Sequence, residues 1–349
     1  MTKANAGNFF EDFEIGQKIV HATPRTITDG DVALYTALYG SRFAVQSSNQ
    51  FARSIGYRDT PIDDLLVFHV VFGKTVPDIS LNAIANLGYA DCRFSVPAFP
   101  NDTLSTVSTI IGKKENSNGK TGVVYVRSKG VNQRGQTVLE FIRWVMVRKR
   151  DANAPAPKPV LPDLPEKVTL TKQTLPAEIK FNLYDNQLAG SPFRFDDYEI
   201  DEKIDHVDGM TIEEAEHGLA TRLYQNTARV HFNQHAEREG RFGKRIVYGG
   251  HIISIARSLS FNGLGNAFRI AAINGGAHVN PCFAGDTVYA WSQILEKTPI
   301  DGWDSLGALR LRTVATKDRI CAGFPYKGDD GKYDPSVVLD LDYTVLLPR

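Results

Sequence analysis

The chain has 349 residues, of which 42% are hydrophobic, and its 40 basic and 40 acidic residues give a formal net charge of +0 at pH 7. This length predicts two domains of ordinary size, and the balanced charge lacks the basic excess that is typical of nucleic-acid-binding proteins. The three cysteines are far apart and form neither a disulfide framework nor a zinc pattern. Because residues 1–16 lack the apolar core of a signal peptide and no stretch is apolar enough to span a membrane, we expect a cytoplasmic protein with no membrane partner.

The chain repeats itself. Residues 10–57 align with residues 195–242 at a constant shift of 185, and residues 94–103 align with residues 278–287 at a shift of 184. The identical pairs include Phe10/Phe195, His21/His206, Leu38/Leu223, Tyr39/Tyr224 and Asp102/Asp286. We interpret the chain as a fusion of two copies of one domain, and we expect functional residues where the copies differ.

A proline-rich stretch separates the two copies. Residues 151–170 hold five prolines and almost no periodic apolar pattern, which is typical of an extended, solvated segment. We therefore predict an N-terminal domain over residues 1–150, a linker over residues 151–190 and a C-terminal domain over residues 191–349.

The predicted elements follow the same order in each copy. Each begins with a Thr-x-x-acid capping box that predicts a helix start, at Thr26 with Asp29 and at Thr211 with Glu214. A strongly apolar helix follows, over residues 61–74 in the first copy and 248–263 in the second. Strand-like runs with β-branched residues come last, over 103–112, 121–130, 138–149, 286–296, 305–316 and 337–347. One apolar helix wrapped by an antiparallel sheet predicts an α+β fold for each copy.

The second copy carries a motif between Tyr224 and Leu259. His231 is followed eighteen residues later by Gly249, which opens the apolar helix together with Gly250. The segment resembles the MaoC-like, R-specific enoyl-CoA hydratase family, in which a D-x-N-P-L-H segment precedes a P-I-V-H-G segment at the start of the central helix. The resemblance implies a tandem (double) hot-dog fold, in which each antiparallel sheet wraps around a central apolar helix.

The resemblance also implies a chemistry: hydration of an enoyl-CoA thioester, with the coenzyme A thioester as the substrate and no cofactor or metal. Adding water to the β-carbon places negative charge on the thioester oxygen, and N–H groups at a helix N-terminus stabilise such charge. Gly249 and Gly250 supply these groups and let a carbonyl approach the backbone closely. His231 is the predicted group that handles the proton of water near neutral pH.

The first copy has lost these residues. The alignment places Gln46 at the position of His231, Ser41 at that of Asn226, Leu65 at that of Gly249 and Leu66 at that of Gly250. We therefore predict that the first copy is not catalytic. The resemblance implies that such a half contributes to the cleft for the acyl chain and coenzyme A.

Asn226 stands where the family has an aspartate. An amide holds a water by hydrogen bonds but cannot act as a base. Either His231 alone carries the proton, or a carboxylate enters from elsewhere. The alternatives are Glu237, Glu239, Asp63, Asp64 and a carboxylate of the substrate itself.

Two cations also distinguish this motif, because Arg229 and Arg245 stand where the family has proline. Arginine binds carboxylates through paired hydrogen bonds. We therefore predict that Arg229, Arg245 and the neighbouring Tyr248 bind a substrate that carries its own carboxylate.

Three other functions stay open at this point, together with homo-oligomer formation. Hot-dog folds also host acyl-CoA thioesterases, and fold alone does not decide chemistry. A general R-specific enoyl-CoA hydratase would need no second carboxylate on its substrate. A non-enzymatic acyl-CoA-binding protein would explain the loss of the aspartate, but retention of His231 and both glycines favours the enzyme.

Overall fold

The computed structural model describes residues 3–170, 179–300 and 302–349, so residues 171–178 of the predicted linker lie outside the described residues. Within the described ranges, the strands form one antiparallel sheet in the order β1-β3-β4-β5-β2-β7-β10-β9-β8-β6. The strands of the first half are β1 Lys18–Thr26, β2 Ala83–Phe94, β3 Thr103–Glu115, β4 Thr121–Val131 and β5 Thr137–Arg148. Those of the second half are β6 Lys203–Thr211, β7 Arg269–His278, β8 Thr287–Ile300, β9 Trp303–Lys317 and β10 Val337–Pro348.

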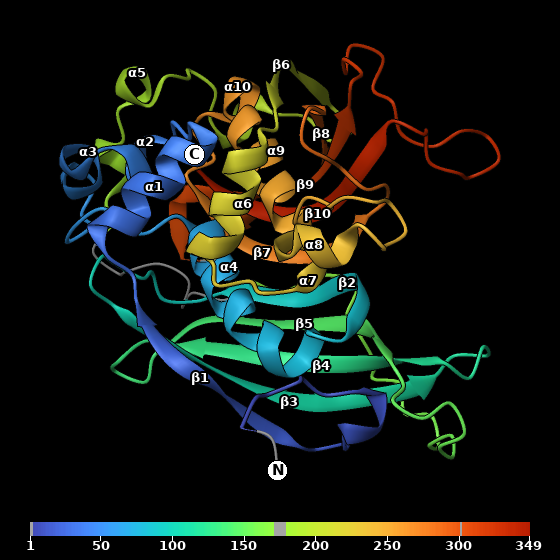
Figure 1. Cartoon of the computed structure of the whole chain (residues 1–349). Coiled ribbons are helices and arrows are strands. Elements are labelled where there is room, and N and C mark those ends of the chain that lie inside the picture. The colour runs from blue at the N-terminus through green and yellow to red at the C-terminus, as the bar shows by residue number, and fades with distance from the viewer. Residues whose placement is uncertain (1–2, 171–178, 301) are drawn as a thin grey trace.

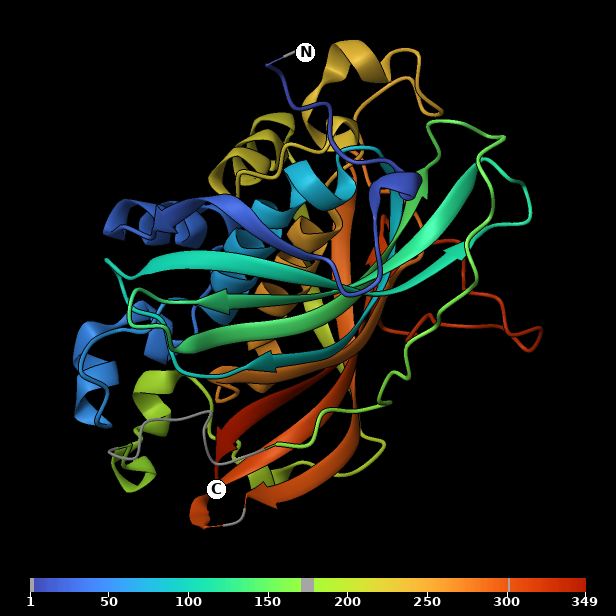
Figure 2. The ribbon, with the colours of Figure 1, turned by 90° about the horizontal axis from the view of Figure 1, so that it is seen from below.

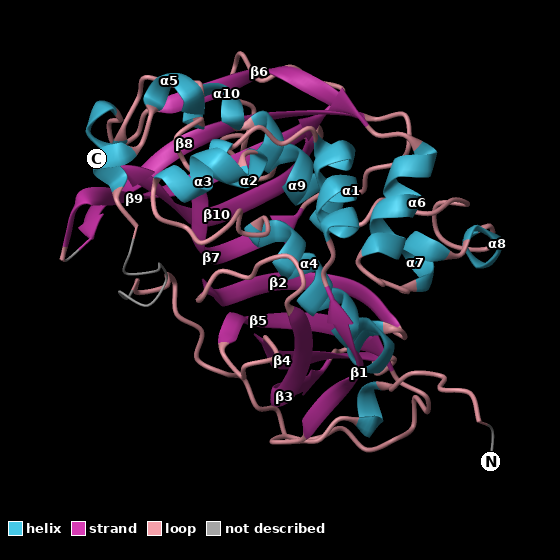
Figure 3. Ribbon diagram, turned by 90° about the vertical axis from the view of Figure 1, so that its left-hand side faces the viewer, coloured by secondary structure: helices cyan, strands magenta, loops and turns pink. Residues whose placement is uncertain are grey.

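Two apolar helices, α4 (Asp64–Thr75) and α9 (Gly249–Leu259), lie at the centre of the two halves. All residues of α4 from Leu65 to Thr75 are buried, as its apolar sequence predicts. The other α-helices are α1 Asp29–Tyr39, α2 Ala44–Ser47, α3 Asn49–Ser54, α5 Asn186–Ala189, α6 Glu214–Leu223, α7 Arg229–Phe232, α8 Gln234–Glu237 and α10 Phe261–Leu264. Short 3-10 or π-helical turns cover Phe10–Asp12, Val76–Ser80, Phe181–Leu183 and Phe195–Asp197. Figures 1 and 3 show the helices gathered on one face of the curved sheet. No helix among the described residues is long and apolar enough to cross a membrane.

The two halves repeat one topology and join edge to edge. The order β1-β3-β4-β5-β2 in the first half corresponds to β6-β8-β9-β10-β7 in the second. Strands β2 and β7 pair antiparallel at the junction, with Tyr89 opposite Gly276 and Cys92 opposite Ile273. Figure 2 shows the strands of the first half continuing into those of the second. A single apolar cluster holds residues of both central helices, so the halves share a core.

The predicted capping boxes were wrong. Thr26 and Thr211 end strands β1 and β6, where they pair with Thr103 and Thr287. In the first half the cap is Thr28, whose backbone N–H donates to Asp31 Oδ2 at 2.8 Å. In the second half α6 begins without a side-chain cap. A Thr-x-x-acid spacing cannot distinguish the last residue of a strand from a cap two residues later.

The described part of the linker lies along the sheet. Val160 pairs with Lys113 of β3 through backbone hydrogen bonds of 2.9 and 2.8 Å. Farther on, the Val168 N–H donates to Asn274 Oδ1 at 2.9 Å. The linker therefore contacts strands of both halves as it passes from one to the other.

Candidate active site

His231 lies on the short helix α7, and its ring is held in one orientation. Its Nδ1 is 2.9 Å from the carbonyl oxygen of Ile246. A carbonyl only accepts, so Nδ1 carries the proton and Nε2 keeps a free lone pair. The ring of Tyr248 packs edge-on against that of His231, with centroids 5.6 Å apart. The histidine is therefore fixed in the tautomer that a base requires.

Burial keeps His231 neutral. It lowers the pKa of the imidazole to about 4, against the opposing effect of the Ile246 carbonyl, which favours the protonated form. The neutral form therefore predominates at every pH well above 4.

This pKa gives a prediction for the pH dependence of activity. Because the base is the neutral imidazole, kcat/KM is expected to stay flat from about pH 8 down to pH 6 and to fall only as the pH approaches the lowered pKa of about 4. Initial rates of hydration measured from pH 4.5 to pH 8, with enzyme stability checked at each pH, test this. An acid limb centred near 6.5, the ordinary histidine pKa, would contradict it.

Asn226 lies in the tight turn before α7, with its side chain buried. Its Oδ1 accepts a hydrogen bond of 3.2 Å from the Ala228 N–H, and its backbone N–H donates to the Thr221 carbonyl at 2.9 Å. Helix α4 of the other half packs against this turn at Gly73, where an added Cβ would lie 1.9 Å from the Tyr224 carbonyl oxygen. The Nδ2 group of Asn226 donates to no described residue, so it is available to a water or a substrate oxygen.

Gly249 and Gly250 form the first turn of α9, after Tyr248 at the N-cap. Their N–H groups have no acceptor among the described residues, as is normal for a helix start. An added Cβ would lie 2.4 Å from the His278 ring at Gly249 and 2.3 Å from the Tyr248 ring at Gly250. Both glycines thus combine free N–H donors with close packing of aromatic rings.

The sequence interpretation missed His278. This residue ends β7, and its ring covers Gly249. Its Nε2 is 3.2 Å from the hydroxyl of Tyr89, which comes from β2 of the first half. Burial and the proximity of His231 lower the pKa of His278 to about 4. The alignment of the two copies could have revealed His278, because the shift of 184 places Phe94 at its position and the copies therefore differ there.

The first half contributes two aromatic residues to this site, Phe72 and Tyr89, which together are called the aromatic wall. The ring of Phe72 on α4 lies 5.8 Å from that of Tyr248 and 6.4 Å from that of Tyr89. Behind it, the hydroxyls of Tyr39 and Tyr224, which are equivalent in the two copies, bond to each other at 2.7 Å. The candidate site therefore lies at the junction of the halves.

Among the described residues, no hydrogen bond or ion pair joins the other predicted residues to His231. Arg229 is exposed on α7. The guanidinium of Arg245 forms an ion pair with Glu214 of α6. Asp63 caps α4, and Asp64 accepts a hydrogen bond of 2.9 Å from the Ile270 N–H. Burial raises the pKa of Asp64 to about 6.

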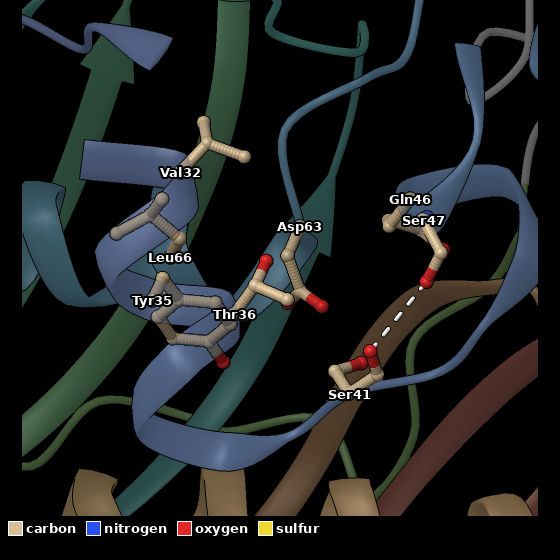
Figure 4. A pocket seen from close by; sticks show the side chains of 8 residues that line it. All are labelled: Val32, Tyr35, Thr36, Ser41, Gln46, Ser47, Asp63 and Leu66. Carbon is tan, nitrogen blue, oxygen red and sulfur yellow. Dashed lines mark hydrogen bonds between the residues drawn. The ribbon is translucent and has the colours of Figure 1, made fainter. Parts of the chain in front are cut away.

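The first half has a cavity at the position that corresponds to the candidate active site of the second half. Figure 4 shows its lining residues, which are Val32, Tyr35, Thr36, Ser41, Gln46, Ser47, Asp63 and Leu66. Ser41 and Gln46 are the positional equivalents of Asn226 and His231. The Gln46 side chain donates to the Phe268 carbonyl at 2.8 Å. The counterpart thus carries an amide where the second half has an imidazole.

Comparisons with known proteins give matches over most of the chain. The profile of the mesaconyl-CoA hydratase family matches residues 1–322. A β-methylmalyl-CoA dehydratase of Chloroflexus aurantiacus is 70% identical over 347 residues, 99% of each chain. A mesaconyl-CoA hydratase of Cereibacter sphaeroides is 57% identical over 347 residues, 99% of this chain and 100% of the relative.

Two solved structures are similar over nearly the whole chain. A MaoC domain protein dehydratase of Chloroflexus aurantiacus superposes with a TM-score of 0.96 and 68% identity, covering 100% of this chain and 99% of the other. A Mycobacterium tuberculosis protein with a double hotdog fold gives a TM-score of 0.80 at 23% identity, covering 99% of both chains.

The fold and the site together define a MaoC-like protein, and the predicted double hot-dog is confirmed. More narrowly, the chain belongs to the mesaconyl-CoA hydratase family.

Proposed function

We propose that this protein catalyses the reversible hydration of mesaconyl-CoA to β-methylmalyl-CoA. Family membership supports the substrate, since relatives 70% and 57% identical over the full chain are named for the two directions of this reaction. The observation that carries the chemistry is the neutral His231, whose Nδ1 is committed to the Ile246 carbonyl and whose Nε2 is free.

The proposed step uses four groups. Asn226 Nδ2 and His231 Nε2 hold one water. As the water oxygen bonds to the β-carbon, His231 takes a proton from it, and the electron pair of the carbon–carbon double bond moves toward the thioester oxygen. The N–H groups of Gly249 and Gly250 stabilise the resulting enolate. The imidazolium then returns the proton to the α-carbon, so atoms and charges balance.

Asn226 suits a substrate with a second carboxylate. In mesaconyl-CoA that carboxylate is attached to the β-carbon, next to the attacking water. An aspartate at position 226 would repel it, whereas an amide adds no charge. We assign the base to His231 alone. Asp63 and Asp64 belong to the cavity of the first half and to the start of α4. Glu237 lies on α8 and Glu239 is exposed beyond it.

We also propose how the two halves divide the work. Residues 191–349 supply the base, the water-holding amide and the oxyanion donors, and residues 1–150 supply the aromatic wall, joined through the linker over 151–190. A cytoplasmic location and the oligomeric state stay predictions.

The substrate prediction is a preference for mesaconyl-CoA over crotonyl-CoA, which lacks the second carboxylate. Asn226→Asp is expected to lower kcat/KM for mesaconyl-CoA by at least about 10-fold while affecting crotonyl-CoA less, because only the former meets a like charge. Loss of enoyl absorbance measures hydration of both substrates.

Two outcomes would change the proposal. Equal rates of the parent protein with both substrates would make it a general enoyl-CoA hydratase. Release of free coenzyme A, measured with a thiol reagent, would make it a thioesterase.

A further inference from the structure

His278 meets Tyr89 of the first half across the junction of the sheet. Tyr89 lies opposite Gly276 in the β2–β7 pair (Figure 3), and His278 is two residues farther along β7, so both side chains extend from one face of the sheet. Tyr89 is 3% exposed, and its hydroxyl is 3.2 Å from Nε2 of His278. Among the described residues, this is the one hydrogen bond that the hydroxyl forms.

This contact determines which nitrogen of His278 carries the proton. Burying a phenol whose proton has no acceptor is costly, and the acceptor that the Tyr89 hydroxyl reaches is Nε2 of His278. The phenol therefore donates to Nε2, and Nδ1 of the neutral ring carries the N–H. The ring is neutral at pH 7, because burial and the nearby His231 lower its pKa to about 4.

His231 and His278 thus have opposite tautomers beside the start of α9. His231 donates from Nδ1 to the Ile246 carbonyl and keeps a lone pair on Nε2, whereas His278 keeps a free Nδ1–H. This Nδ1 lies 2.6 Å from the position that a Cβ on Gly249 would take. Both imidazoles and Gly249 are only partly buried, so none of the three is sealed from solvent. The site therefore presents one accepting and one donating imidazole.

The copy without a base lacks this arrangement. Phe94 occupies the position of His278, and its ring offers no N–H. The start of α4 is capped by its own sequence, since Asp63 Oδ1 accepts the Leu65 N–H at 2.9 Å, whereas α9 begins without a side-chain cap. An uncapped start of the central helix and a histidine beside it therefore occur together, in the half that carries His231.

We infer that His278 donates its Nδ1–H to the thioester oxygen, as a further oxyanion donor beside Gly249 and Gly250, and that Tyr89 holds it in the donating tautomer. This inference rests on the proposed function and adds a residue to its site. A neutral imidazole polarises a carbonyl through its N–H, and the hydrogen bond strengthens as negative charge grows on the oxygen. The proton stays on Nδ1, so the balance of the proposed step is unchanged. Through Tyr89, the first half takes part in positioning the donor.

A purely structural role for His278 makes different predictions. A ring that only covers Gly249 could be replaced by the phenylalanine that the first copy has at this position, with little loss of turnover. A hydrogen-bond donor cannot be replaced in this way. Because it acts on charge that develops during the reaction, its loss should lower kcat and kcat/KM together and leave KM nearly unchanged.

The test compares His278→Phe, His278→Asn and Tyr89→Phe with the parent protein. Phenylalanine keeps a ring and removes the donor, whereas the asparagine amide stands as many bonds from the backbone as Nδ1 and can donate from there. The matched control is Tyr125→Phe, because Tyr125 lies on β4 of the same half and its hydroxyl forms no hydrogen bond among the described residues. Steady-state rates with mesaconyl-CoA give kcat and KM, and thermal melts show whether each variant is folded.

We expect His278→Phe to lower kcat by about 100-fold, the usual cost of removing one oxyanion donor. His278→Asn should turn over at least about 10-fold faster than His278→Phe, because it restores an N–H near the same place. Tyr89→Phe should cause a smaller loss, since the ring then populates both tautomers, and Tyr125→Phe should behave like the parent.

A second measurement is independent of turnover. Nitrogen NMR of protein labelled with ¹⁵N-histidine identifies the protonated nitrogen of His278, whose signals are those missing from His278→Asn. We expect the Nδ1–H form in the parent and a mixture in Tyr89→Phe. Adding methylsuccinyl-CoA, a saturated thioester that cannot be hydrated, should move the Nδ1 proton resonance to lower field as the proton enters a hydrogen bond.

Three results overturn the inference: a proton on Nε2 in the parent, an Nδ1–H resonance that does not move when the thioester binds, or a folded His278→Phe variant with the turnover of the parent. If His278→Phe fails to fold, the spectra of the parent decide. Failure of the proposed function is a separate result, since it appears as a parent protein that does not hydrate mesaconyl-CoA.

Discussion

Replacing His231 by alanine is expected to lower kcat/KM for hydration by about 1,000-fold, which lies within the usual contribution of a general base. The reason is the fixed tautomer. With Nδ1 donating to the Ile246 carbonyl at 2.9 Å, Nε2 is the basic atom of the site, and Asn226 cannot replace it. Steady-state rates with mesaconyl-CoA measure the loss, and His231→Gln separates basicity from hydrogen bonding because glutamine still accepts a hydrogen bond.

The matched control is Gln46→Ala in the other copy. Gln46 occupies the position of His231 and donates to the Phe268 carbonyl at 2.8 Å, so its loss should cost about 1 kcal/mol of stability and little activity. Thermal melting measures the first effect and initial rates the second. Comparable losses of activity in the two variants would refute the assignment of catalysis to the C-terminal half.

The sequence predicted the parts of the fold that have strong periodicity. Helix α4 is apolar along its whole length, and β3, β4, β5, β8, β9 and β10 are rich in β-branched residues, so each lies close to its predicted range. Four strands were missed. Strands β1 and β6 end at the two threonines that the capping-box spacing assigns to helix starts. The sequences of β2 and β7, AIANLGYADCRF and RIAAINGGAH, are rich in alanine and glycine, which are weak strand formers. They form the junction of the halves, where pairing with each other stabilises them.

The sequence also predicted only part of the candidate site. His231, Asn226 and the two glycines stood out because they are close in sequence and differ between the copies. Phe72 and Tyr89 lie on separate elements of the copy without a base, and only the packing of α4 beside Tyr248 and the pairing of β2 with β7 bring them to the site. Sequence spacing carries no information on such contacts. It did suggest two cations for the substrate carboxylate, Arg229 and Arg245. Of these, Arg245 is paired with Glu214 and Arg229 is exposed on α7.

The role of Gly249 can be separated from its packing. Gly249→Val is expected to lower kcat by about 100-fold, on the order of 3 kcal/mol of transition-state stabilisation, the loss typical of a disturbed oxyanion site. An added Cβ would lie 2.4 Å from the His278 ring, so either the ring or the start of α9 must move. Rates with mesaconyl-CoA measure the effect, and a thermal melt shows whether the variant is folded. A folded variant with unchanged turnover would place the oxyanion donors elsewhere.

A double-mutant cycle with Gly249→Ala and His278→Ala identifies the cause of the loss. Alanine keeps the backbone N–H, so any loss of activity that Gly249→Ala causes in the otherwise unchanged protein comes from the methyl group alone. Removing the ring of His278 frees the space that this methyl group needs. We therefore expect Gly249→Ala to slow the parent protein but to have little further effect in the His278→Ala background, a non-additivity characteristic of side chains in contact. Equal losses in both backgrounds would mean that the methyl group meets the thioester itself, and that the glycine is required for the close approach of the substrate to the helix start.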